Sequence, residues 1–174
     1  NDPFIAPPAP GGIPTVPPGT PVRLLTLNEA FDPFGRLIQF LGTATAMKNK
    51  GGGFARMYTD PATEVVNRNA TEVWQIINLT ADTHPIHFHL VNVQIVSRQP
   101  FRATNYGGGL PTYIGPARPP DPNEAGWKET VRMNPGEVTT VIMQFKLPTV
   151  PFAVPTSPRA AGTAFPLGLP AGTV

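Results

Sequence analysis

All three histidines of this 174-residue chain lie within one short segment, 82-DTHPIHFHLVNVQIV-96, at His84, His87 and His89. Imidazole is the commonest metal ligand in proteins and suits copper, zinc, iron and nickel. The alternative for any single histidine is an ordinary core or surface residue, which when buried needs a hydrogen-bond partner. Because all three are concentrated here, the segment is predicted to bind metal through His84, His87 and His89.

The spacing of these histidines indicates which of them could bind the same metal ion. If 87–96 is one continuous strand, His87 and His89 lie on one face, because successive side chains alternate between faces. Their Cα atoms would then be about 6.5–7 Å apart, so the pair can bind one ion or two neighbouring ions. Pro85 disfavours helix at His84. We therefore expect His84 to point from a turn before the strand, where it can serve a different centre from the other two.

The elements that must position these histidines are predicted to be strands. The chain has 24 prolines and 17 glycines, which favour turns and irregular connections, and no convincing helical periodicity of ten or more residues. The spacing of short apolar runs suits an antiparallel β-sandwich, with a tight turn at 134–136. The candidate strands are 22–31, 36–42, 55–60, 71–80, 87–98, 129–133 and 137–147.

Length and composition predict one folded domain with flanking segments. Hydrophobic residues make up 40% of the chain and charged residues 14%, as in globular proteins. The net charge of +2 comes without a basic block, which argues against nucleic-acid binding, and no apolar run is long enough to span a bilayer. We expect a Pro-rich interdomain linker at 1–21, a domain at 22–147 containing a long loop at 101–126, and a Pro/Gly-rich segment at 148–174.

The motif 84-HPIHFHL-90 resembles the third of the four copper-binding motifs of multicopper oxidases, the laccase family. The similarity extends to 71-TEVWQIINLTADTHPIHFHLVNVQIVSRQPF-101, 113-YIGPARPP-120, 126-GWKETV-131, 136-GEV-138 and 24-LLTLNEAFDPFGR-36. These segments resemble the C-terminal cupredoxin domain of bacterial spore-coat laccases. The resemblance covers most of 22–147 and implies an all-β, cupredoxin-like Greek-key sandwich or barrel with long Pro/Gly-rich loops, the third domain of such an oxidase.

The resemblance also implies a role for each histidine. His84 would bind the type 1 copper, His87 the type 2 copper and His89 one of the paired type 3 coppers. The complete enzyme, with four coppers, would oxidise a phenol, a pigment or a metal ion one electron at a time and reduce O2 to water at the trinuclear cluster. The family further implies an extracellular, periplasmic or cell-surface location, with no nucleic-acid partner and no membrane span.

The fourth motif of the family contains the cysteine ligand of type 1 copper, and this chain has no cysteine. Blue-copper geometry requires two histidines and a cysteine, of which this chain can give one histidine. We therefore expect an inactive piece of a larger oxidase, whose partners are the remaining polypeptide segments with the other histidine motifs. The segment 148–174 is expected to precede the missing fourth motif.

Two other functions remain as alternatives. One is a non-catalytic copper-binding cupredoxin module that keeps the motif without catalysis. The other is a mononuclear zinc or iron site of cupin type using His87 and His89, although such sites usually recruit a carboxylate and a later histidine, and no histidine follows His89. Within 126-GWKETV-131, Glu129 could orient a ligand histidine, or it could be an ordinary charge at a strand edge.

Overall fold

The computed structural model describes residue 5 and residues 12–47 and 53–146. Within these residues the regular secondary structure is β, apart from one short 3-10 turn, η2 (Pro122–Glu124). No helix of the described part is long and apolar enough to cross a membrane. The eight strands are β1 (Val22–Phe31), β2 (Leu37–Thr43), β3 (Thr71–Asn78), β4 (His84–His87), β5 (Val93–Pro100), β6 (Trp127–Lys128), β7 (Thr130–Met133) and β8 (Glu137–Gln144).

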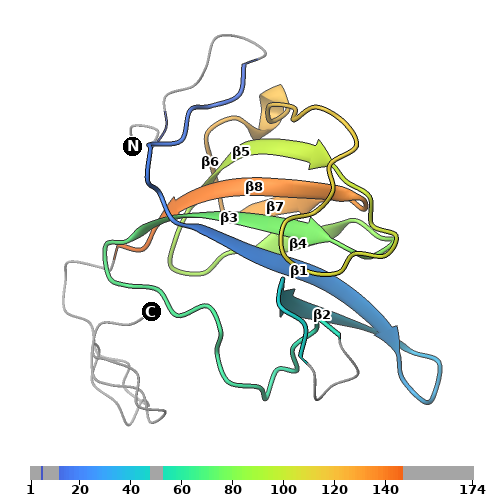
Figure 1. Cartoon of the computed structure of the whole chain (residues 1–174). Coiled ribbons are helices and arrows are strands. Elements are labelled where there is room, and N and C mark those ends of the chain that lie inside the picture. The colour runs from blue at the N-terminus through green and yellow to red at the C-terminus, as the bar shows by residue number, and fades with distance from the viewer. Residues whose placement is uncertain (1–4, 6–11, 48–52, 147–174) are drawn as a thin grey trace, which may run out of the picture.

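The strands form a six-stranded sheet, ordered β2-β1-β3-β8-β5-β6, and a two-stranded sheet of β4 and β7 (Figure 1). Neighbouring strands of the large sheet are antiparallel except β1 and β3, which are parallel, with Val22 opposite Val73 and Leu27 opposite Asn78. The expectation of an antiparallel sandwich is therefore corrected at this pair. A parallel neighbour requires a long crossover connection, here the segment from 44 to 70 together with β2.

Most of the predicted strands form, and outside the predicted strand 87–98 their ends differ from the prediction by at most three residues. The run 55–60 is wrong as a strand, because it contributes only an isolated bridge between Ala55 and Gly42. The turn at 134–136 is present, with Gly136 at φ 67°. It carries the chain from β7 in the small sheet to β8 in the large one, so these strands leave the turn in different layers.

The predicted continuous strand through the last two histidines is also wrong. β4 ends at His87 and β5 begins at Val93, because β4 pairs with β7 while β5 pairs with β8. The chain changes sheets between them, and Leu90 adopts φ 71°, a left-handed conformation that ends regular pairing. His84, expected in a turn, is the first residue of β4, opposite Met133.

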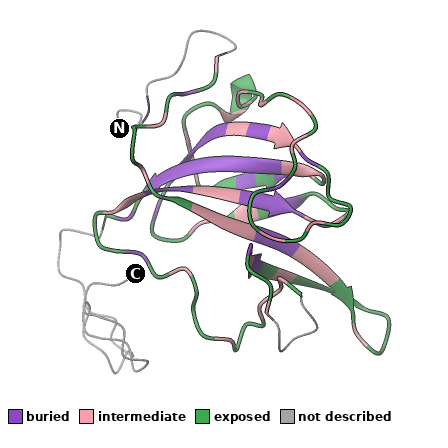
Figure 2. Cartoon of the chain, viewed as in Figure 1, coloured by how far each residue is buried: buried purple, intermediate pink, exposed green. Residues whose placement is uncertain are grey.

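The main core is made of buried residues from both sheets, and Figure 2 marks buried stretches on strands of each. β7 contributes Val131 and Met133, and β8 contributes Val141 and Met143, all at most 1% exposed. Complete burial of such a side chain stabilises a fold by about 1.5–3 kcal/mol. This packing fixes the small sheet against the large one, and it therefore fixes the position of β4 and its histidines.

A smaller core covers the other face of the large sheet and involves the N-terminal segment. Ile5 is 5% exposed and packs with Val73, Val96 and Ile142. Its backbone N–H donates to Gln94 Oε1 at 2.8 Å. At least this residue of the predicted linker 1–21 is thus packed against the domain, while the predicted segment 148–174 lies outside the described residues.

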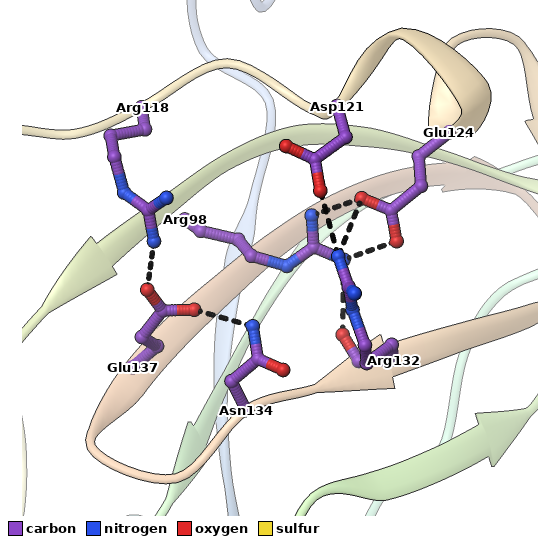
Figure 3. A network of polar contacts seen from close by, with 7 residues as sticks. All are labelled: Arg98, Arg118, Asp121, Glu124, Arg132, Asn134 and Glu137. Carbon is purple, nitrogen blue, oxygen red and sulfur yellow. Dashed lines mark hydrogen bonds and ion pairs between the residues drawn. The ribbon is translucent and has the colours of Figure 1, made fainter.

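The long loop predicted at 101–126 is held to the sheet by backbone bridges and charges. Arg118 pairs with Arg98, and Tyr113 pairs with Phe101. Figure 3 shows the polar network beside them, in which three arginines meet three carboxylates and an asparagine. Its members are Arg98, Arg118, Asp121, Glu124, Arg132, Asn134 and Glu137.

Candidate metal centre

His84 is buried at the start of β4, with 8% of its surface exposed. Its Nε2 lies 2.8 Å from Thr80 Oγ1 and 3.1 Å from Glu29 Oε1. Thr80 comes from the turn after β3, and Glu29 comes from β1. Three elements therefore meet at this imidazole, which has one nitrogen engaged and no described hydrogen bond at the other.

His87 and His89 form a separate pair at the other end of β4. Both are exposed, and their ring centroids are 5.0 Å apart in an edge-to-face arrangement with an interplanar angle of 79°. His87 Nδ1 lies 3.0 Å from the hydroxyl of Thr130, its partner across the β4–β7 pair. The contact leaves Nε2 of His87 without a described hydrogen bond, whereas at His84 the nitrogen without one is Nδ1. The ring nitrogen available to a metal therefore differs between the two residues.

The three histidines border two different cavities. His87 and His89 line a cavity of about 290 Å³ whose wall is largely apolar, including Trp74, Met143 and Phe145. His84 lines a second cavity of about 340 Å³, together with residues of the β1–β2 hairpin. Leu27, Leu41 and Ile86 border both cavities. The histidines are therefore divided between two cavities, with His84 at one and His87 and His89 at the other.

The donor chemistry fits copper, although the donor sets are partial. Imidazole nitrogen is a ligand that copper favours, and all three rings have a nitrogen without a described hydrogen bond. Among the described residues, no group of three or more histidine, cysteine or carboxylate side chains is placed to hold a metal ion. A copper site at these histidines would need ligands beyond those that the described residues place together, and for the cupin-type alternative the described residues place no carboxylate close enough to His87 and His89 to complete a metal-binding group.

Glu129 shows no contact with a histidine side chain. It is exposed, and its backbone carbonyl accepts a hydrogen bond from Phe88 N at 2.8 Å. The residues that do contact the imidazoles are Thr80, Glu29 and Thr130, which the sequence reasoning missed. All three lie inside segments that carry the family resemblance, 24–36, 71–101 and 126–131, but no residue type or spacing in those segments singled them out.

The chain belongs to the multicopper oxidase family, whose sequence model matches residues 32–152. It is 38% identical over 125 residues to a laccase of Bacillus subtilis and 36% identical over 124 residues to a laccase of Bacillus stratosphericus. Each alignment covers 71% of this chain and 22% of the relative. The chain thus spans about a fifth of the length of these relatives.

More distant proteins of the same kind also match. A multicopper oxidase of Arabidopsis thaliana, LPR1, is 30% identical over 51% of this chain and 18% of its own length. Among solved structures, the multicopper oxidase McoA of Aquifex aeolicus matches with a TM-score of 0.46 and 20% identity, over 79% of this chain and 25% of McoA. A laccase of Pediococcus acidilactici matches with a TM-score of 0.45 and 22% identity, over 76% and 22%. The eight strands of the described residues confirm the predicted all-β class, and the family to which the chain belongs agrees with its cupredoxin-like form.

Proposed function

We propose that this chain forms part of a laccase-like multicopper oxidase, which takes electrons singly from a reducing substrate and reduces O2 to water. Membership of the family supports this proposal. Bound copper supplies the one-electron redox chemistry, while the protein sets ligand geometry and potential. The contribution of this chain is the third histidine motif of the enzyme.

We assign His84 to the type 1 copper, His87 to the type 2 copper and His89 to a type 3 copper. The observation that carries the assignment is the division of the histidines between two cavities. The rings of His87 and His89, 5.0 Å apart, are close enough to serve neighbouring ions of one cluster. His84 is buried beside β1 and holds its imidazole apart from them.

Catalysis by this assignment requires ligands that the 174 residues do not contain, since they have no cysteine and only three histidines. The partners are segments of the same oxidase that carry the other histidine motifs and the type 1 cysteine. We take 22–147 as the cupredoxin-like domain and place the enzyme outside the cytoplasm, on the basis of its family. The reducing substrate is a phenol, a pigment or a low-valent metal ion.

The test uses the copper-loaded oxidase that contains this chain together with the remaining ligand segments. His84→Ala should abolish the blue type 1 absorption and lower the copper content by about one ion. His87→Ala should leave the blue band and remove the type 2 signal from the electron paramagnetic resonance spectrum. O2 consumption should be lost in both, and Tyr58→Ala, at a fully exposed ring, should behave as the wild type.

The outcomes separate the proposal from its rivals. Loss of the blue band in His87→Ala, with its retention in His84→Ala, would reverse the assignment. Copper binding without any O2 consumption by the unaltered protein would favour the non-catalytic copper module. A single bound zinc or iron would rule out the oxidase.

A further inference from the structure

The surroundings of His84 determine which of its ring nitrogens carries the hydrogen. Asn78, the last residue of β3, is completely buried. Its Nδ2 donates to the carbonyl oxygens of Asp82 at 2.8 Å and Met133 at 3.0 Å. Because a carbonyl can only accept, these two bonds fix the orientation of the Asn78 amide. Its Oδ1 therefore faces Thr80 as an acceptor.

Because Asn78 Oδ1 is an acceptor, the Thr80 hydroxyl that contacts it is oriented as well, and this orientation determines how the hydroxyl can bind His84. Asn78 Oδ1 accepts the backbone N–H of Thr80 at 2.9 Å and lies 2.7 Å from Thr80 Oγ1. Thr80 Oγ1 also lies 3.1 Å from the Asp82 carbonyl, which is likewise only an acceptor. The single hydroxyl hydrogen is directed to one of these oxygens. Oγ1 then accepts, at 2.8 Å, a hydrogen bond from His84 Nε2, and Nε2 must carry the hydrogen.

Glu29 leads independently to the same conclusion. Its Oε1 is buried and has no hydrogen-bond partner among the described residues, although it lies 3.1 Å from His84 Nε2. This pair is a close electrostatic contact rather than an aligned hydrogen bond, since the N–H bond is directed at Thr80. A carboxylate oxygen repels an imidazole lone pair and attracts an N–H. The contact is favourable only if Nε2 is protonated.

We propose that Asn78, Thr80 and Glu29 are positioning residues that keep the hydrogen of His84 on Nε2 and so reserve Nδ1 as its metal-donor atom. The location of the hydrogen follows from the contacts of this chain, and the use of Nδ1 toward copper rests on the proposed function. Partners on the second nitrogen of a ligand histidine fix its tautomer and ring orientation and raise its basicity. Thr130, on Nδ1 of His87, leaves the opposite nitrogen free there.

The tautomer can be measured in the metal-free 174-residue chain by long-range 1H–15N NMR of the imidazoles, at a pH where they are neutral. His84 should be present as the Nε2–H form, with a ring hydrogen that exchanges slowly with solvent. The exposed His89 provides the internal reference in the same spectrum. A single hydrogen bond changes such a population ratio by about tenfold.

Two variants test the positioning residues directly. Thr80→Val removes the acceptor, and Glu29→Gln removes the charge while keeping the side-chain shape. Each should shift the tautomer ratio of His84 toward that of His89 and speed up exchange of its ring hydrogen. Thr80→Ser, which retains the hydroxyl, should preserve the wild-type ratio. If Thr80→Val does not fold, Glu29→Gln carries the test.

Glu129→Gln is the control, because it removes an exposed carboxylate that takes no part in the contacts of Asn78, Thr80 and Glu29. It should leave the ratio unchanged. An Nδ1–H tautomer in the unaltered chain overturns the proposal, as does an unchanged ratio in either Thr80→Val or Glu29→Gln.

The assignment of His84 to type 1 copper is tested separately from the positioning of its imidazole, because the NMR measurement needs no metal. If His84→Ala in the complete oxidase keeps the blue band while the tautomer data hold, the type 1 assignment falls and the positioning of the imidazole stands. If the blue band is lost but His84 proves to be Nδ1–H, the positioning role falls and the assignment stands.

Discussion

The guanidinium of Arg98 meets the carboxylate of Glu124 through two contacts, Nη1 to Oε2 at 2.5 Å and Nη2 to Oε1 at 2.9 Å. Arg98 belongs to β5, and Glu124 belongs to the 3-10 turn that closes the long loop. Their side chains are only 4% and 12% exposed. This ion pair ties the loop to β5 of the large sheet (Figure 3).

Glu124→Gln should lower the free energy of unfolding by about 3 kcal/mol, because it leaves a buried guanidinium without its counter-charge. Urea unfolding followed by tryptophan fluorescence measures the change. Arg36→Gln is the matched control, since Arg36 is 74% exposed in its ion pair with Asp32 and should lose no more than about 1 kcal/mol. Equal losses in the two variants would contradict a stabilising role for the buried pair.

Gly42 on β2 lies where three other groups converge. A Cβ there would come within 2.3 Å of the Phe54 carbonyl oxygen, 2.7 Å of Thr26 Oγ1 and 2.8 Å of Asn28 Nδ2. Gly42→Ala should therefore lower the free energy of unfolding by about 1–3 kcal/mol. Gly107→Ala, where a Cβ would meet nothing within 4 Å, should raise it by up to about 1 kcal/mol. Thermal unfolding of both variants provides the comparison.

Stability should fall in acid partly through Glu72. Burial alone would raise the pKa of this carboxyl, but hydrogen bonds from Arg23 and Trp74 and the charge of Arg23 hold the pKa below its ordinary value of 4.5. A carboxyl with a lowered pKa in the folded state stabilises the fold above its unfolded pKa, and this contribution is lost as the pH falls through the folded pKa. Glu72→Gln should flatten this acid dependence in urea unfolding measured from pH 7 downward. Glu129→Gln, at an exposed residue, should retain it.

Stability should also fall in alkali through Tyr106. Burial, reinforced by the nearby Tyr113, raises the pKa of its phenol from 10.0 to about 12, and its hydroxyl donates to the Gly109 carbonyl at 2.6 Å. Because the unfolded chain ionises first, stability should decrease as the pH rises from 10 through 12. Tyr106→Phe should reduce this decrease in unfolding experiments, while the contribution of Tyr113, whose pKa is also raised by burial, remains. Tyr58→Phe, at a fully exposed ring, should leave it in place.

The local sequence was sufficient to predict most strands of the large sheet. The run 22–31 is a strand over those residues, and 71–80 and 137–147 contain β3 and β8. Apolar residues at strand spacing and the turn residues between them carry this information. The error at 87–96 arose because a continuous apolar run does not reveal which sheet each half will join. Pairing with β7 on one side and β8 on the other produced the break near Leu90.

By itself, the sequence determined the chemistry that is present: three imidazoles in one motif, no cysteine, and the multicopper oxidase family. The tertiary structure decided how those imidazoles are divided and held. Glu29 is 55 positions before His84 in the chain, and Thr130 is 43 positions after His87. Side-chain contacts across such separations depend on strand register and on the packing of two sheets, which no short segment specifies alone. The contacts of Glu29 with His84 and of Thr130 with His87 therefore became visible only once β1, β4 and β7 were in place.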